Sequence, residues 1–200
     1  MRHTSRLTVT TLISLALTVP MLAAPAPQSQ SAPAKPAAAA PAPPPAPCTS
    51  PESRQLDFWV GEWDLSWPGP GGKPGGTATN RVEKTLGGCV IEEHFTANGA
   101  NAMLGHSVST YNPLEKVWKQ TWVDNQGGYI ALTGEFKDGE MRLISHGTAP
   151  DGKPTMGRMV FYNIKPDSFD WRWESSKDNG ANWNLQWPIH YQRKGTSPKG

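Results

Sequence analysis

The sequence predicts an all-β domain, an antiparallel up-and-down barrel of about ten strands. Nine clusters of glycine, proline, asparagine and aspartate interrupt the chain after residue 47 at nearly regular intervals. They separate segments of about 7 to 11 residues that are rich in β-branched and aromatic residues and alternate in polarity. Several of the breaks, such as "KDGE" and "KDNGAN", carry the Asp-Gly or Asn-Gly pair of tight hairpin turns. No segment has a convincing helical pattern, so hairpins joined in sequence are the expected architecture.

Residues 1–24 have the features of a secretory signal peptide. Arg2, His3 and Arg6 precede an apolar run, 7–23, which ends in small residues. An uncleaved membrane anchor is the alternative, but Thr residues and a proline interrupt the run, and it is short for a span of ~20 residues. We therefore expect export to the periplasm or the medium, without stable membrane insertion after cleavage.

A proline-alanine tract separates this segment from the domain. Residues 25–47 hold nine prolines and nine alanines, a composition typical of a disordered, semi-extended linker. The domain then covers residues 48–194, and residues 195–200 form a disordered tail. All 17 Asp and Glu residues and all but three of the 19 Lys and Arg residues follow residue 47, so the domain is close to neutral. A near-neutral domain does not indicate a nucleic acid or anionic lipid partner.

The two cysteines, Cys48 and Cys89, are expected to form a disulfide. An isolated pair in an exported protein is more often bridged than free, and this bridge would close a loop of 41 residues. Two unrelated thiols are the alternative. The chain contains neither a CxxC redox motif nor a cysteine spacing typical of zinc sites.

The stretch "DFWVGEWDLSW" is predicted to be the first strand. In a strand, Trp59, Gly61, Trp63, Leu65 and Trp67 share one face, and the charged residues between them share the other. A helix would also align the tryptophans, but it would place a glycine within the helix and a proline directly after it. We therefore expect an inward stripe of tryptophans in which Gly61 leaves room for the first ring.

Five blocks resemble, in order, a family of exported bacterial proteins of unknown function: "RQLDFWVGEWDLSW", "LGGCVIEEHF", "WKQTWVD", "KDGEM" and "WESSKDNGANW…YQR". This family is grouped with the calycin or lipocalin-like barrels, near nitrobindin and the fatty-acid-binding proteins. The likeness covers roughly residues 50–194. It implies a calycin-like barrel and implies no activity, because the family has none agreed.

Strand alternation places a carboxylate on an apolar face. In "CVIEEHF", Glu93 shares a face with Cys89, Ile91 and Phe95. Because an unpaired buried carboxylate costs several kcal/mol, such a group is either paired or functional. Glu93 is therefore one of the polar candidates of the predicted interior.

The other predicted inward faces are aromatic with a few polar groups, as in small-molecule pockets. In "GRMVFYN" the sequence does not decide which alternate set faces inward, so Arg158 is only a conditional member. We expect the interior to bind a small apolar or amphipathic molecule through these candidates: Trp63, Glu93, Ser107, Tyr111, Gln120, Trp122, Asp124, Arg158 and Trp173.

Two alternatives remain open for the same interior. Small barrels often fill themselves with side chains, which would make the domain a structural module. The pocket could instead belong to an enzyme of the isomerase or cyclase type with Glu93 as its base. No catalytic residue is assigned, and no Gly-x-Ser-x-Gly motif supports a hydrolase.

The histidines do not predict a metal site, because none has a short metal-binding spacing. His94 and His106 lie opposite the predicted inward faces and should face solvent. His190 lies near the C-terminus, where nitrobindin-like barrels carry their haem ligand, so the resemblance leaves haem as an alternative. If Tyr191 faces inward, however, His190 faces outward, unless Pro188 marks a bulge that resets the alternation. No cofactor is therefore expected.

Overall fold

The computed structural model describes residues 47–73, 75–99 and 102–196. The predicted signal peptide, the linker up to residue 46 and the tail from residue 197 lie outside the described residues. Within the described part, no helix has the length and apolar character that a membrane-crossing helix requires.

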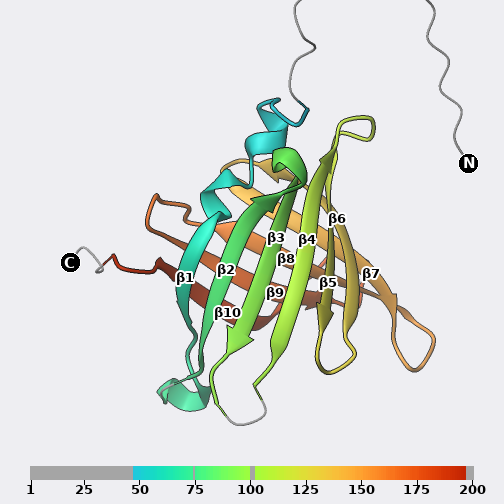
Figure 1. The fold of residues 1–200 in the computed structure, drawn as a ribbon. Helices are drawn as coiled ribbons and strands as arrows, with labels where there is room; N and C mark the ends of the chain where they lie inside the picture. The colour runs from blue at the N-terminus through green and yellow to red at the C-terminus, as the bar shows by residue number, and fades with distance from the viewer. Residues whose placement is uncertain (1–46, 74, 100–101, 197–200) are drawn as a thin grey trace, which may run out of the picture. The chain divides into compact units, whose positions relative to one another are not determined.

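The domain is a closed antiparallel barrel, which confirms the predicted fold class. Each strand pairs with its neighbours in the chain, and the last strand pairs with the first to close the sheet (Figure 1). The ten described strands are β1 (Gly61–Ser66), β2 (Thr77–Thr85), β3 (Val90–Ala97), β4 (Leu104–Asn112), β5 (Val117–Asp124), β6 (Tyr129–Lys137), β7 (Glu140–Thr148), β8 (Pro154–Tyr162), β9 (Ser168–Ser176) and β10 (Asn184–Arg193).

The predicted breaks coincide with the connections between these strands. The β6–β7 hairpin turns at Asp138 and Gly139, with φ of 54° and 80°. The β9–β10 connection uses Asn179 and Gly180 with φ of 57° and 84°. Consecutive residues with positive φ are typical of the turns that match the twist of antiparallel strands, which explains why these residue pairs stand there.

A short N-terminal segment closes one end of the barrel. It contains two 3₁₀ turns, η1 (Glu52–Arg54) and η2 (Asp57–Trp59), and we call residues 52–60 the N-terminal plug. Leu56 and Trp59 of the plug are almost fully buried. The two remaining 3₁₀ turns, η3 (Pro70–Gly72) and η4 (Leu86–Gly88), belong to strand connections. In Figure 1 the plug lies at the end of the barrel where β1 begins.

The plug corrects the prediction that Trp59 belongs to the first strand. Trp59 ends η2, and β1 begins only at Gly61. Gly61 has a φ of 140°, a backbone conformation that residues with a Cβ rarely adopt, so the chain changes direction there. Trp63 and Leu65 lie on the inward face of β1 as predicted.

The predicted disulfide is confirmed. Cys48 and Cys89 are bridged, with their Cα atoms 5.1 Å apart. The bridge joins the chain just before the plug to the residue that precedes β3. It therefore holds the N-terminal segment at the end of the barrel that the plug closes.

Arg193, at the end of β10, connects the plug to the closing strand pair. Its guanidinium lies over the ring of Trp63, 4.2 Å from the ring centroid. Nη1 donates to the carbonyl oxygen of Val60 at 3.0 Å, and Nη2 donates to that of Phe58 at 3.3 Å. A Cβ at Gly61 would lie 2.2 Å from Nη1, so Gly61 leaves space for this arginine and not, as predicted, for the first tryptophan ring.

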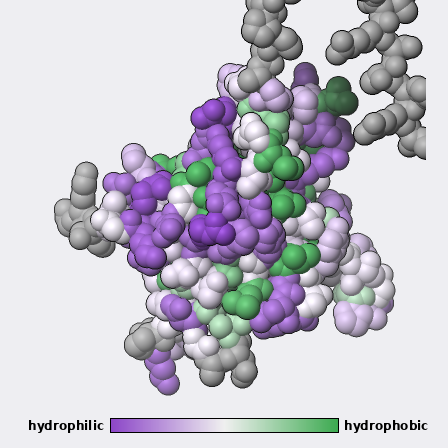
Figure 2. All heavy atoms as spheres, viewed as in Figure 1, coloured by the Kyte–Doolittle hydropathy of each residue, from purple (hydrophilic) through white to green (hydrophobic). Residues whose placement is uncertain are grey.

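The outer surface over the first strands is mixed in character. Figure 2 shows hydrophilic residues gathered over the strands that face the viewer in Figure 1, with smaller hydrophobic patches between them. The inward residues of the same strands are buried and mostly apolar. Outward polar residues thus alternate with inward apolar residues along the strands. This is the sequence pattern that predicts a barrel with a solvated outer face and a buried inner face.

Replacing Arg193 with alanine should lower the free energy of unfolding by about 2 kcal/mol or more, because plug carbonyls lose their charged donor and Trp63 loses its cover. Denaturant unfolding monitored by tryptophan fluorescence would measure this. Lys194→Ala, which removes only an exposed ion pair with Glu62, is the matched control and should change the value by less than about 1 kcal/mol. Equal effects of the two substitutions would contradict this role for Arg193.

Candidate ligand-binding site

The interior of the barrel contains a cavity of about 200 Å³. Its walls come from β3, β5, β6, β8, β9 and β10, the plug contributes Trp59, and the β3–β4 connection contributes Met103. Most lining side chains are aromatic or aliphatic, and two are carboxylates. The lining residues are Trp59, Glu93, Phe95, Met103, Trp122, Asp124, Ile130, Met159, Phe161, Trp171, Trp173, Trp187, Ile189 and Tyr191.

Strand register arranges the aromatic wall. Trp173 lies opposite Trp187 of β10, and Trp171 lies opposite Phe161 of β8. The rings of Trp171 and Trp187 meet edge to face, with their centroids 5.9 Å apart, and Phe95 meets Trp187 in the same way at 6.1 Å. All three rings line the cavity, where a ligand can contact the parts that their neighbours leave uncovered.

Two glycines make room for the largest rings. A Cβ at Gly105 would lie 1.9 Å from the ring of Trp122, and one at Gly157 would lie 2.3 Å from that of Trp173. Each tryptophan ring therefore occupies space that a side chain on the neighbouring strand would otherwise fill. The shape of the cavity depends on glycines that do not themselves line it.

Glu93 supplies one of the two carboxyl groups of the cavity wall. Its Oε1 accepts a hydrogen bond from Asn80 Nδ2 at 2.7 Å, and its Oε2 accepts one from Ser107 Oγ at 2.6 Å. Gln120 Nε2 donates to Ser107 Oγ at 3.3 Å and to Ser109 Oγ at 2.9 Å. All five side chains are buried, so this network fixes the position of one carboxyl group among apolar neighbours.

Burial controls the protonation of this network. It raises the pKa of Glu93 to about 7, although the hydrogen bonds from Ser107 and Asn80 act in the opposite direction. Burial and the charge of Glu93 together raise the pKa of Tyr191 well above its ordinary value. The hydroxyl of Tyr191 therefore stays neutral beside a carboxyl group that titrates near neutral pH.

Asp124 is the second carboxylate of the cavity. One of its oxygens accepts from the backbone N–H groups of Gln126 and Gly128 at 2.9 Å, and the other accepts from Trp122 Nε1 at 3.1 Å. The backbone bond from Gly128 and then the bond from Trp122 hold the pKa of Asp124 below its ordinary value. Asp124 is therefore ionised at neutral pH, and no Lys, Arg or His is among the described lining residues.

The structure brings only part of the predicted residue set to the cavity. Glu93, Trp122, Asp124 and Trp173 line it. Ser107 and Gln120 lie behind Glu93 in the buried network. The remaining candidates, Trp63, Tyr111 and Arg158, do not line it.

The side chain of each of these three candidates makes its contacts outside the cavity. Trp63 packs against Phe169 with ring centroids 4.9 Å apart, and Tyr111 packs against Trp118 with centroids 5.9 Å apart. Arg158 forms an ion pair with Glu174, on the face of β8 opposite the inward Met159. The residues of "GRMVFYN" that face the cavity are therefore Met159 and Phe161.

The geometry does not fit haem ligation by His190. Its side chain is half exposed on the outer face, where Nδ1 lies 2.8 Å from Asp170 Oδ1. Ile189 and Tyr191 face the cavity. The register shift in β10 lies between Leu185 and Trp187, so it precedes Pro188 and does not reset the alternation after it. No histidine lies among the described residues of the cavity wall, and the interior therefore offers no imidazole for a haem iron.

Several cavity residues were missing from the predicted set. Trp171 shares the predicted inward face of "FDWRWES" with Trp173, and "WPIHY" places Trp187, Ile189 and Tyr191 on one face, so alternation indicates Trp171, Trp187 and Tyr191 as inward residues. Asn80 could have been found in the same way, since it lies between Ala78 and Val82 on the buried face of β2. The contact of Asn80 with Glu93 depends on strand pairing and has no signal in either segment alone.

Residues 49–193 match the model of DUF1579, a family of proteins of unknown function. The chain belongs to this family. The match spans the plug and all ten described strands, so the family corresponds to the barrel as a whole. No curated protein matches the chain. The relation to calycin barrels and nitrobindin stays a prediction.

Replacing Glu93 with glutamine should change how stability depends on pH. The pKa of Glu93 is about 7 in the folded protein against an ordinary value of 4.5, so the folded state keeps a proton that the unfolded state loses. The contribution of protonated Glu93 to the free energy of unfolding is therefore complete below pH 4.5. It falls by about 3 kcal/mol as the pH rises through 7.

Glutamine carries no such proton, so the variant should gain about 3 kcal/mol relative to wild type between pH 4.5 and about pH 8. Urea unfolding at the two pH values measures this difference. Glu135→Gln, on the exposed face of β6, is the control and should show a much smaller change. A difference between Glu93→Gln and wild type that does not vary with pH would contradict the burial of an ionisable group.

Proposed function

We propose that the chain is an exported, calycin-like binding protein that takes up a small, mostly apolar molecule carrying one positive charge. A protonated amine attached to one or two rings is the ligand class that the cavity suits best. The observation that supports this proposal most directly is the composition of the cavity wall. The wall is largely aromatic, with two carboxylates and, among its described residues, no cationic side chain.

The size of the cavity supports a small ligand. Its volume of about 200 Å³ is slightly larger than the ~150 Å³ engineered cavity that binds benzene. It lies below the range of about 300 to 1,000 Å³ usual for drug-sized ligands. A one-ring or small two-ring compound is therefore favoured over a long acyl chain or a macrocycle.

The aromatic walls and carboxylates support a cation. Tryptophan ring faces attract ammonium groups through their quadrupole, with about 2 kcal/mol or more when the pair is removed from water. Trp122, Trp171, Trp173 and Trp187 all line the cavity. Asp124 is held ionised, and Glu93 has one lone pair on each oxygen beyond its two hydrogen bonds.

The bridge between Cys48 and Cys89 supports export, because structural disulfides persist in oxidising compartments. A protein that meets its ligand outside the cytoplasm is consistent with the predicted leader and linker. In that compartment the protein would take up or sequester an amine from the surroundings.

Titration with 2-phenylethylamine and with its neutral analogue 2-phenylethanol tests the proposal. Tryptophan fluorescence reports binding directly, because several tryptophans line the cavity. We expect the amine to bind about tenfold or more tightly than the alcohol. Glu93→Gln should reduce this preference and keep the affinity for the alcohol, whereas the exposed control Glu135→Gln should leave both unchanged.

The other outcomes have definite meanings. Equal affinity for the two probes would reject the cationic class and leave an apolar binding site. Failure of both probes to bind would favour a structural module, whose interior does not open to ligands. Conversion of a bound amine, lost in Glu93→Gln without loss of binding, would favour the enzymatic alternative.

A further inference from the structure

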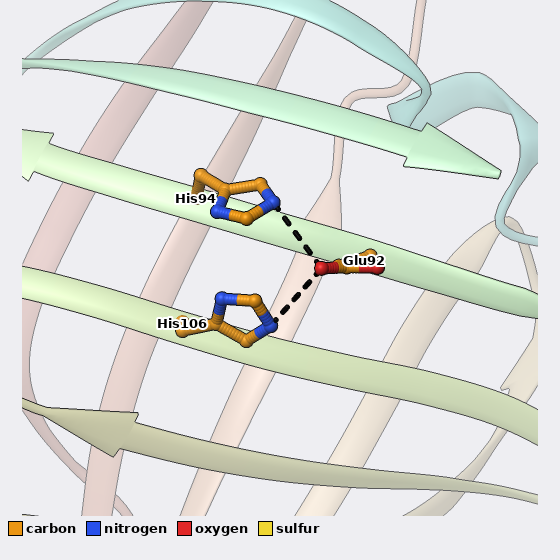
Figure 3. Close-up of side chains that lie close together, drawn as sticks. All are labelled: Glu92, His94 and His106. Atoms are coloured by element: carbon orange, nitrogen blue, oxygen red, sulfur yellow. Dashed lines mark ion pairs between the residues drawn. The ribbon is translucent and has the colours of Figure 1, made fainter. Parts of the chain in front are cut away.

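Two histidines and a glutamate meet on the outer face of the barrel. His94 of β3 lies directly opposite His106 of β4, and Glu92 lies two residues from His94 on the same face of β3. The inward neighbours Glu93 and Phe95 fix this direction, because both line the cavity. Figure 3 shows both imidazole rings directed toward the carboxylate between the two strands. We call Glu92, His94 and His106 the outer histidine cluster.

The distances within the cluster suit a metal ion. Nε2 of His94 and Nε2 of His106 each lie 3.4 Å from the same Oε1 of Glu92. Ligands held at about 2.0 to 2.1 Å in a tetrahedron lie about 3.3 to 3.4 Å apart, so two of the three edges already have that length. All three ligand atoms lie within 4.8 Å of one another, and side-chain rotation can close the third edge.

A second observation separates the cluster from ordinary surface histidines. Nε2 of His94 is inaccessible to solvent, and it has no hydrogen-bond partner among the described residues. Burying a polar nitrogen without a hydrogen-bond partner costs free energy, and a bound metal ion would remove that cost. The nearest carboxylate oxygens, on Glu92 and Glu83, lie 3.4 and 3.9 Å from it.

We propose that the outer histidine cluster binds a divalent transition metal ion, with Zn²⁺ as the expected type. Two imidazole nitrogens and one carboxylate oxygen are donors that zinc and its neighbours prefer, whereas calcium and magnesium prefer oxygen donors alone. Three protein ligands leave a fourth tetrahedral position for water or an external ligand. Glu83 lies close enough to reach that position if it leaves its ion pair with Arg81.

A simple ion-pair network is the competing explanation. Either histidine could carry a proton and pair with Glu92 without any metal, as His190 pairs with Asp170 elsewhere on the surface. The two explanations differ in what they predict for added metal. A metal site at the cluster would bind Zn²⁺ more tightly than a single histidine beside one carboxylate, such as His190 beside Asp170. An ion-pair network would not.

The test is isothermal titration of the full chain, made without a polyhistidine tag, with ZnCl₂. We expect one ion per chain, and we expect His94→Ala and His106→Ala each to weaken binding by about tenfold or more. Glu92→Gln should weaken it as well while keeping the shape of the side chain. His190→Ala is the matched control, because it removes a histidine of the outer face that also contacts a carboxylate, and it should bind like wild type.

Thermal unfolding supplies the second readout. Saturating Zn²⁺ should raise the melting temperature of the wild type and of His190→Ala, because an ion that binds only the folded state stabilises it. It should raise that of the His94 and His106 variants much less. Absence of zinc binding by the wild type, or binding that both variants retain, would overturn the proposal. If an alanine variant does not fold, Glu92→Gln decides the outcome.

Discussion

The contact of Arg193 with Trp63 is the constraint on which the rest of the barrel depends. Trp63 lies on the first strand and Arg193 at the end of the last, so their contact spans the pair that closes the sheet. The same guanidinium donates to backbone carbonyls of the plug, and Trp63 Nε1 donates to the carbonyl of Trp59 at 2.8 Å. The same two side chains therefore support both the closure of the sheet and the closure of one end of the barrel. Gly61 is required because any side chain there would displace the arginine.

Local patterns explain which parts of the fold could be predicted from the sequence. Turn chemistry located the hairpins, and alternation assigned inward faces to β3, β5 and β9, because both depend only on residues close in the chain. Trp59 was misplaced since spacing alone does not distinguish a strand from a 3₁₀ turn followed by a glycine bend. The inward face of β8 stayed undecided because Arg158 stands within an otherwise apolar segment, and its partner Glu174 lies on a different strand.

The candidate sites show the same limit more sharply. Alternation identified Glu93 but could not show that Asn80 and Ser107 hold it, because these contacts depend on register between strands. His94 and His106 are twelve positions apart and have no metal-binding spacing, yet pairing of β3 with β4 places them opposite each other. Sequence patterns within one strand therefore find single site residues, and the groups that act together become visible only when the sheet is assembled.

The position of the plug divides the barrel into two halves with different freedom to change. The closing strand pair, the disulfide and the buried Trp59 lie at the plugged end, so a substitution there affects the stability of the whole domain. At the other end, the cavity residues Asp124 and Trp187 stand beside the β5–β6 and β9–β10 connections, which take no part in that closure. If the cavity binds a ligand as we propose, substitutions in these connections would change its ligand preference and leave the closure of the barrel intact. The end of the barrel opposite the plug is therefore where substitutions should cost the least stability.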